Sequence, residues 1–455
     1  MAELRPGPKI LSLGPEFYDA VEPAAFPKCI PRFLNGRWAN EVGLNFDEEG
    51  WARHFCRFEP LPGNLKQPLA LRYHGHQFRV YNPEIGDGRG FTFAQLRDST
   101  GRLLDLGTKG SGQTPYSRHA DGRLTLKGGV REVLATEMLE ALGVNTSKSF
   151  ALFETGEELE RGDEPSPTRS AVLTRLSHGH IRIGTFQRLA FFGQVDNIRK
   201  LVRYVLEELY GEQPGEDDQE NALKLFERVS AATSTLAASY LAAGFVHGVL
   251  NSDNINVTGE SFDYGPWRFT PDWDAEFTAA YFDHYGLYAF GRQPEAIQWD
   301  LAHLAGSLTL VAEAPPLSDM MAAWSGRFED ALVDRMAWRL GVAPDREVAA
   351  ALIRALTSKE AEIDRVFFDW RGGNDPGPDR YPSEPFRALA SILKGKQQPR
   401  SHSYWSDDQP CSMHIEEVEA IWSAIAERDD WQPFHDKVRA IRRMGEAMVQ
   451  DAVTA

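Results

Sequence analysis

The feature that most constrains this chain is a short polar loop, His247-Gly248-Val249-Leu250-Asn251-Ser252-Asp253-Asn254, which is followed nine residues later by Asp263-Tyr264-Gly265. Asn254 and Asp263 supply oxygen ligands of the kind that Mg²⁺ and Mn²⁺ prefer in proteins. Asp253 adds a carboxylate that can orient or deprotonate a hydroxyl nucleophile. The alternative interpretation is structural, with Asp and Asn capping a loop and a second Asp forming a turn. We favour the metal-binding interpretation because of the order of these residues.

That order is the one found in the catalytic and metal-binding segments of kinase folds, with one change. In kinases an Asp two residues after the His acts as a base, and an Asn and an Asp-x-Gly further along bind metal. Val249 occupies the base position here, and an acidic group reappears at Asp253. We therefore predict that the metal site is retained and that the catalytic base has moved.

Length and composition limit the class of protein. A chain of 455 residues is longer than one small domain needs, so we expect a two-lobed enzyme with extensions. With 66 Asp and Glu against 49 Lys and Arg, the net charge of −17 argues against nucleic-acid binding. We expect a monomer with no signal peptide and no membrane span, located in the cytoplasm.

The three cysteines are widely spaced. Cys29, Cys56 and Cys411 have no CxxC spacing, which fits a reducing cytosol and predicts neither a disulfide framework nor a thiolate zinc site.

The hydrophobic pattern changes along the chain from strand-like to helical. Residues 91–96 and 103–108 are expected to form a hairpin, 128–142 a helix, and 148–153 and 171–176 two strands that flank a charged loop at 155–169. A short strand is expected at 255–257. Later helices are expected at 195–211, 219–243, 295–312, 319–341, 346–369, 384–394, 414–427 and 431–452.

The pattern predicts an α+β, two-lobed protein-kinase-like fold, with a β-rich N-lobe and a helical C-lobe. We place an N-terminal extension at 1–68, the N-lobe at 69–190, the C-lobe at 191–395 and a C-terminal helical extension at 396–455.

A glycine-rich run precedes the predicted hairpin. Gly86 and Gly88 lack a Cβ atom and would let backbone N–H groups approach a phosphate, and Arg89 adds positive charge. A tight turn without a ligand is the alternative for such a run. Asp121-Gly122-Arg123 also reads first as a turn, although its position in the chain would place it near a bound nucleotide.

Basic residues at strand ends are further candidates for phosphate binding. Lys109 closes the second predicted strand, and Glu132 lies on the helix that follows, as in the lysine–glutamate pair of kinases. Arg175 ends an apolar strand and Arg182 follows seven residues later; a guanidinium group can bind phosphate oxygens through two hydrogen bonds. The alternative for Lys109 and Glu132 is a solvated surface.

With these residues in hand, the chain resembles the SelO/YdiU family of kinase-fold protein adenylyltransferases. The resemblance runs from about Tyr73 to Leu304. It rests on the blocks Gly75–Phe78, Gly86–Gly90, Lys109-Gly110, Thr114–Arg118, Asp121–Arg123, Arg131-Glu132, His180–Gly184, His247–Asn254 and Phe262–Pro266. The N-terminal region matches loosely, and the usual block after residue 385 is not matched.

The resemblance implies transfer of AMP from ATP to Ser, Thr or Tyr hydroxyls of proteins, with Mg²⁺ or Mn²⁺ as cofactor. It implies Glu132 as the partner of Lys109, Asp253 as proton acceptor, and Asn254 and Asp263 as metal ligands. The implied nucleotide contacts are Gly86, Gly88, Arg89, Lys109, Asp121, Gly122, Arg175, Arg182 and the metal-bound Asp263.

Three alternatives stay open at this point. The first is transfer of UMP from UTP, as some members of the family do. The second is a kinase-like phosphotransferase, although Val249 in the usual Asp position counts against this. The last alternative is a non-catalytic nucleotide-binding pseudokinase.

Overall fold

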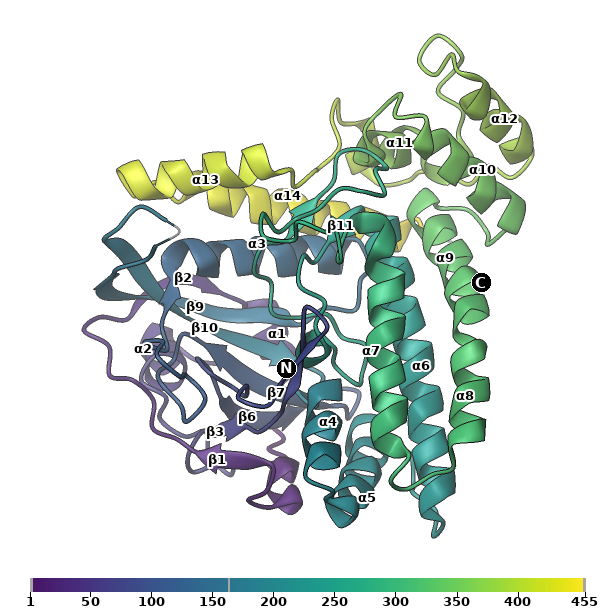
Figure 1. Ribbon diagram of the computed structural model, residues 1–455. Helices are drawn as coiled ribbons and strands as arrows, with labels where there is room; N and C mark the ends of the chain where they lie inside the picture. The colour runs from purple at the N-terminus through teal and green to yellow at the C-terminus, as the bar shows by residue number, and fades with distance from the viewer. Residues whose placement is uncertain (1–2, 163, 453–455) are drawn as a thin grey trace.

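A computed structural model describes residues 3–162 and 164–452 of the chain. The fold is α+β: an antiparallel sheet lies on one side and a layer of long helices on the other (Figure 1). The polar loop identified in the sequence comes after the longest helix, Asp218–Ala243, and contains a turn of 3-10 helix at Ser252–Asn254.

The main sheet has the strand order β1-β3-β6-β7-β10-β9-β2, and β8 pairs with β10. The bounds of these strands are β1 Tyr18–Ala20, β2 Ile30–Leu34, β3 Leu69–Leu71, β6 Thr92–Arg97, β7 Leu103–Lys109, β8 Leu124–Thr125, β9 Lys148–Leu159 and β10 Thr168–Ser177. The predicted hairpin is confirmed as β6 and β7. Short pairs are formed by β4 Gly75–Gln77 with β5 Val80–Asn82, and by β11 Phe245–Val246 with β12 Arg268–Phe269.

Strands β9 and β10 extend further than the sequence pattern indicated. The prediction of a charged loop over 155–169 is wrong at both ends, because Arg169 pairs in register with Glu158. The guanidinium group of Arg169 also lies 2.7 Å from the carboxylate of Glu154. Opposite charges on neighbouring strands stabilise such a pairing, so charged residues do not end these strands.

Helix α3, Leu126–Ala141, packs across β9 and β10. The side-chain hydroxyl of Thr125 accepts a hydrogen bond from the backbone N–H of Gly128 and so caps its first turn. The chain leaves the helix through Gly143, whose φ of 70° is a left-handed conformation that glycine adopts without strain. The helix predicted over 128–142 is therefore confirmed.

The remaining helices form the second layer and the C-terminal region. They are α4 Ile183–Phe191, α5 Val195–Tyr204, α6 Asp218–Ala243, α7 Gln293–Leu308, α8 Ala314–Ala322, α9 Trp324–Leu340, α10 Arg346–Thr357, α11 Ile363–Asp369, α12 Glu384–Leu393, α13 Ile415–Arg428 and α14 Gln432–Gln450. Helix α14 returns from the far end of the chain to pack on α3 (Figure 1).

Two predicted helices are each divided. The helix predicted over 319–341 becomes α8 and α9, and the one over 346–369 becomes α10 and α11. Lys359 has a left-handed φ of 54° and interrupts the second of these.

The prediction of a strand at 255–257 is wrong, because only Asn256 forms a bridge, with Arg182. None of the described helices is both long enough and apolar enough to cross a membrane.

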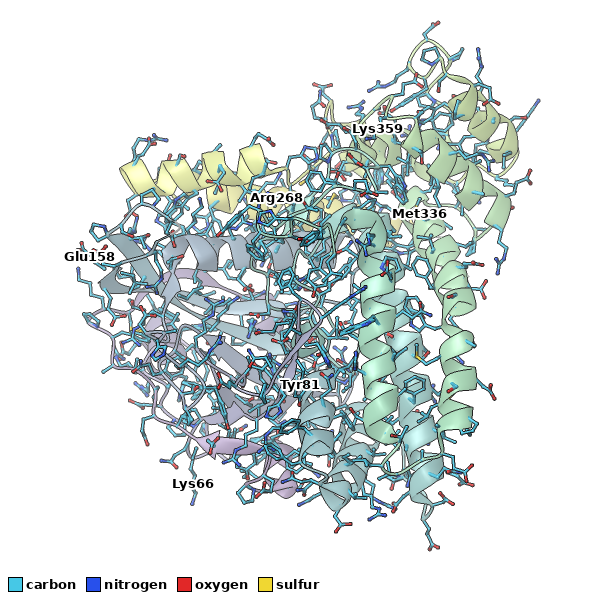
Figure 2. The ribbon with its side chains drawn as sticks, in the orientation of Figure 1. Lys66, Tyr81, Glu158, Arg268, Met336 and Lys359 are labelled. Atoms are coloured by element: carbon cyan, nitrogen blue, oxygen red, sulfur yellow. A yellow bond between two sulfur atoms is a disulfide. The ribbon has the colours of Figure 1, made fainter. Side chains whose placement is uncertain are left out.

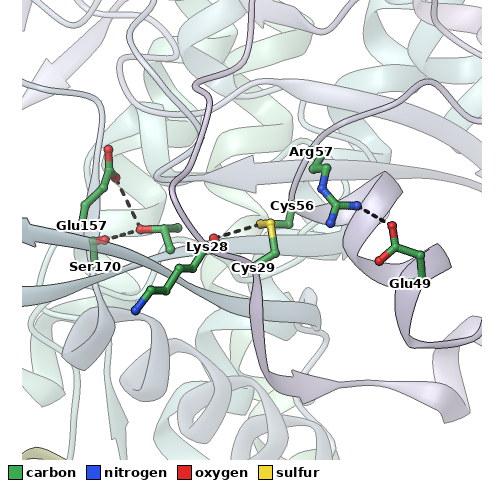
Figure 3. Close-up of a disulfide and its surroundings, with 8 residues drawn as sticks. Lys28, Cys29, Glu49, Cys56, Arg57, Glu157 and Ser170 are labelled. Atoms are coloured by element: carbon green, nitrogen blue, oxygen red, sulfur yellow. Dashed lines mark hydrogen bonds and ion pairs between the residues drawn. A yellow bond between two sulfur atoms is a disulfide. The ribbon is translucent and has the colours of Figure 1, made fainter.

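The first 68 residues contribute to the sheet itself. Two short helices, α1 Gly36–Glu41 and α2 Glu48–Phe55, follow β2. The expectation that the cysteines form no disulfide is wrong, because Cys29 and Cys56 are joined (Figure 3). They are 27 residues apart, so no local spacing signals the pair; the folding of this segment against the sheet brings them together.

Candidate functional site

A cavity of about 320 Å³ lies where β7, β10, the glycine-rich loop and the Ser252–Asn254 turn meet. Its acidic lining residues are Asp87, Asp253 and Asp263, and its basic lining residues are Arg89, Lys109, Arg118, Arg175 and Arg182. The basic groups come from segments far apart in the sequence. A cavity with this lining suits a ligand that carries several negative charges.

Lys109 joins the sheet to helix α3 and to the Asp263 turn. It is the last residue of β7 and is 3% exposed, and its ammonium group contacts the carboxylate of Glu132 on α3, which is 1% exposed. The same ammonium nitrogen lies 2.8 Å from Oδ1 of Asp263. A buried charge is stable only when it is paired, so these three side chains fix one another in position.

Asp263 receives a second cation from β10. Nη1 of Arg175 donates a hydrogen bond to Oδ1 of Asp263 over 3.2 Å. Burial alone would raise the pKa of the Asp263 carboxyl, but the charges of Lys109 and Arg175 outweigh burial and hold it well below its usual value. Asp263 also has a left-handed φ of 64°, which is uncommon for a residue with a side chain. The turn thus holds an ionised carboxylate at the cavity.

Arg182 is held in a pocket of aromatic rings and oxygen acceptors. Its guanidinium carbon lies 4.2 Å from the ring centroid of Tyr73 and 4.9 Å from that of Phe262. Nη2 lies 3.0 Å from Oδ1 of Asp87, and Nη1 donates to the backbone carbonyl of Asp253 over 3.1 Å. This arrangement orients a planar cation toward the cavity and ties it to the polar loop.

The carboxylate of Asp253 is buried at the cavity with one oxygen available to accept a hydrogen bond. The residue is 8% exposed, and its Oδ1 has no hydrogen-bond partner in the described part of the chain. Burial raises the pKa of this carboxyl to about 6, although the nearby charge of Arg182 opposes the rise. A buried oxygen without a partner costs free energy, so it points to an absent ligand or substrate group.

Close packing requires glycine at two positions of the loop before β6. A Cβ atom added at Gly86 would come within 2.5 Å of the Tyr116 ring, and one at Gly90 within 2.1 Å of the Thr108 carbonyl oxygen. At Gly88 the nearest atom, the carbonyl oxygen of Tyr116, would be 3.1 Å away. Close packing therefore explains Gly86 and Gly90, while the loop backbone still faces the cavity.

Four of the predicted site residues do not line the cavity: Glu132, which instead contacts the ammonium group of Lys109, and Asn254, Asp121 and Gly122. Asn254 donates a hydrogen bond from Nδ2 to the carbonyl oxygen of Val249 over 3.1 Å. Asp121 is bound by Arg161, whose Nη1 lies 2.9 Å from its Oδ2. Gly122 has a φ of 71° and packs against Gly112, to which an added Cβ would come within 2.3 Å.

The side-chain oxygens at the cavity could bind a divalent cation only if water or phosphate oxygens completed its coordination shell. No group of three or more His, Cys, Asp or Glu side chains within residues 3–162 and 164–452 is arranged to hold a metal ion. Asp263 nevertheless presents a carboxylate to the cavity, and the hydrogen bond that the Asn254 side chain makes to Val249 uses its Nδ2, not its amide oxygen. Magnesium commonly takes one or two carboxylates and completes its shell with water and substrate phosphates, so the Asp263 carboxylate fits such an ion.

Comparison with known proteins now decides the family. A family model described as "Protein adenylyltransferase SelO" matches residues 1–373. The chain belongs to the SelO/YdiU family. It is 42% identical to a protein of Gloeobacter violaceus over 96% of this chain and 94% of the relative, and 39% identical to a protein of Synechocystis over 96% and 97%. A protein of Synechococcus elongatus is 39% identical over 98% of this chain and 96% of its own length.

These relatives carry the name "Protein nucleotidyltransferase YdiU". The resemblance found in the sequence is thereby confirmed. This member of the SelO/YdiU family is an enzyme of the nucleotidyltransferase class.

Sequence reasoning missed two acidic residues of this region. Asp87 lies within the glycine-rich run, where its neighbours gave it no role, yet it holds Arg182 and accepts a hydrogen bond from the backbone N–H of Leu71 over 3.0 Å. Asp300 on α7 is 0% exposed, and neither carboxylate oxygen has a hydrogen-bond partner among the residues described. Burial, and then the charge of Asp253, raises its pKa well above the usual value. A lone Asp in an amphipathic helix gives no sign of such burial.

Proposed function

We propose that this chain is a protein adenylyltransferase that transfers AMP from ATP to Ser, Thr or Tyr hydroxyls of acceptor proteins, within a two-lobed kinase-like fold. Membership in the SelO/YdiU family supports nucleotidyl transfer. The observation that carries the finer assignment is the free, buried carboxylate oxygen of Asp253 in a cavity lined by basic side chains.

The proposed step is an in-line displacement at the α-phosphorus of ATP. The acceptor oxygen forms a bond to the α-phosphorus, and the bond from this phosphorus to the bridging oxygen of the β-phosphate breaks. The hydroxyl proton passes to Asp253, and pyrophosphate leaves with the electron pair. Proton transfer to a positioned carboxylate is worth about 10²–10⁴-fold in rate.

The basic residues would bind and stabilise the phosphates. Lys109, Arg175 and Arg182 line the cavity and are held by Glu132, Asp263 and Asp87 respectively. Cations fixed before the reaction need no reorganisation as charge develops on the leaving group. Arg89 and the backbone of the loop that contains Gly86 and Gly88 would add contacts from the other wall.

Asn254 and Asp263 are the proposed ligands of Mg²⁺ or Mn²⁺, which would neutralise phosphate charge when bound. The Asn254 side chain would have to offer its amide oxygen while Nδ2 keeps its bond to Val249. Asp121 and Gly122 are proposed to contact the nucleotide from the edge of the cavity, next to the lining residue Ala120. A monomer acting in the cytoplasm is the proposed setting, but the Cys29–Cys56 disulfide removes the support that the cysteine spacing gave to a reducing compartment.

Identification of the leaving group tests this function. The purified protein is incubated with ATP, MgCl₂ or MnCl₂ and unfolded casein as acceptor, and the released products are separated. We expect pyrophosphate in an amount equal to the modified acceptor. Release of ADP would instead identify a phosphotransferase, and release of neither would favour a nucleotide-binding scaffold. UTP replaces ATP in a parallel reaction to test UMP transfer.

A further inference from the structure

The β4–β5 hairpin has a strained turn beside the proposed catalytic loop. Phe78 and Arg79 connect the strands, and both have left-handed backbones, with φ of 50° and 63°. Two consecutive left-handed residues form a type I′ turn, for which Asn and Gly are the usual residues. A phenylalanine is strained in this conformation, and strain of this kind is a sign of function where surrounding contacts hold it in place.

Contacts to the catalytic loop hold this turn. The backbone N–H of Phe78 donates to Oδ1 of Asn251 over 3.0 Å, and that of His76 donates to Oγ of Ser252 over 2.8 Å. A Cβ atom added at Gly75 would lie 3.1 Å from Cβ of Asp253. The hairpin therefore has a fixed position next to Asp253. Figure 2 labels Tyr81 of β5, near the centre of the molecule between the sheet and the long helices.

Exposed aromatic side chains extend outward from this turn. The ring centroid of Phe78 lies 5.8 Å from that of Phe282, which in turn lies 5.1 Å from that of Tyr281. Phe78 is 37% exposed, Phe282 41% and Tyr281 80%, and Tyr285 in the same loop is 93% exposed. We call Phe78, Tyr281, Phe282 and Tyr285 the aromatic surface. The rings of Phe78, Phe282 and Tyr281 form a chain of neighbours, and Tyr285 follows in the same loop. Exposed aromatic groups of this kind are typical of sites that bind another polypeptide.

The charges around the aromatic surface favour an apolar partner. Arg79, the cation in the turn, is paired with Glu295 through a contact of 2.7 Å. The turn therefore offers apolar area with little free charge. Gln77, which precedes Phe78 in the chain, lines the nucleotide cavity, so the aromatic surface begins one residue from the cavity lining.

We propose that the aromatic surface binds the acceptor polypeptide by burying an apolar side chain that lies within a few residues of the modified hydroxyl. This inference rests on the proposed function, because it names the feature by which that same site selects its protein acceptor. It predicts acceptor segments in which Ser, Thr or Tyr has an aromatic or large aliphatic neighbour.

Direct peptide binding tests the aromatic surface without requiring transfer. Two fluorescent peptides are used, each with one Thr, flanked in one by Phe and Leu and in the other by Ala and Gly. Affinity is measured by fluorescence polarisation with the full chain. We expect the Phe/Leu peptide to bind at least tenfold more tightly, and Tyr281→Ser/Phe282→Ser to abolish that difference. Equal binding of the two peptides to the wild type, or undiminished discrimination by the variant, would overturn the proposal.

Two further variants separate docking from folding. Tyr285→Ser removes the most exposed ring of the aromatic surface and should weaken binding of the Phe/Leu peptide severalfold even if the double variant fails to fold. Val449→Ser replaces a 73% exposed apolar side chain on α14 and should leave discrimination unchanged. If the wild type discriminates between the peptides but incorporates no α-phosphate label from ATP, the docking surface stands and the proposed function fails.

Discussion

The ammonium nitrogen of Lys109 lies 2.8 Å from Oδ1 of Asp263 and also contacts the carboxylate of Glu132. One lysine therefore links the end of a strand, a helix and the turn proposed to hold a metal. Lys109 and Arg175 balance the negative charge of the Asp263 carboxylate, so a divalent ion would have to share or displace their contacts with it. Under the proposed function, Lys109 would couple the positions of the phosphates and of the metal.

Lys109→Met is expected to lower the free energy of unfolding by about 3–5 kcal/mol, because it leaves Glu132 buried beside Asp263 without their shared cation. Urea denaturation measures the change. Lys66→Met, at an exposed position labelled in Figure 2, is the matched control and should change stability by less than about 0.5 kcal/mol. Adding Glu132→Gln to Lys109→Met should recover part of the loss. Equal costs for the two lysine variants would contradict the buried ion pair.

Asp253→Asn is expected to lower kcat by about 10²–10⁴-fold while leaving ATP affinity unchanged or tighter, because it removes a base and a negative charge from the cavity. Steady-state transfer assays and calorimetric titration with ATP measure the two effects. Asp319→Asn, at an exposed position on α8, is the control. A variant that keeps wild-type kcat would exclude Asp253 as the proton acceptor.

Asp300→Asn is expected to make the protein more stable than the wild type above neutral pH. The pKa of Asp300 is raised in the folded state, so the folded protein binds a proton more tightly there than the unfolded chain does. The stabilisation that this carboxyl provides is fully present below its pKa in the unfolded chain, about 4. It is lost as the pH rises toward the pKa of the folded state.

Denaturation at pH 4, 6 and 8 measures this difference. The advantage of Asp300→Asn over the wild type should grow with pH, by about 1.4 kcal/mol for each pH unit above 4 until the folded pKa is reached. Asp196→Asn, whose side chain is 95% exposed, should show no such trend. An advantage that is the same at all three pH values would show that the Asp300 carboxyl is not perturbed.

Joint replacement of Cys29 and Cys56 by serine is expected to lower the free energy of unfolding by about 3 kcal/mol in oxidising buffer. The disulfide closes a loop with a sequence separation of 27, and the loss of that constraint increases the entropy of the unfolded chain. Wild-type protein in a reducing agent should then match the variant. A wild type whose stability does not respond to reductant would argue against the bond.

Local patterns in the sequence predicted the parts of the fold that depend on local physics. The strand-like pattern of residues 91–96 and 103–108 predicted the β6–β7 hairpin, and the helical pattern of residues 128–142 predicted α3. The end of β9 was missed because its charged residues pair with Arg169 across the sheet instead of facing a loop. The Cys29–Cys56 bond and the burial of Asp300 were missed because each depends on residues distant in the chain.

The candidate site shows the same division. Motif order placed Lys109, Arg175, Arg182, Asp253 and Asp263 among the candidates, and these line one cavity. The order of motifs did not indicate which glycines of the loop are required by close packing. It also did not indicate that Asp87 binds Arg182. Nor did it indicate that Asn254 and Asp121 lie outside the lining, since side-chain direction follows from the folded backbone.

The most direct test of the central claim follows the phosphates of ATP. The wild type and Asp263→Ala are incubated with unfolded casein, metal and ATP labelled in parallel at the α- or γ-phosphate. We predict protein-bound α-label without γ-label for the wild type and neither label for the variant. Protein-bound γ-label without α-label would contradict nucleotidyl transfer and identify the chain as a kinase despite Val249.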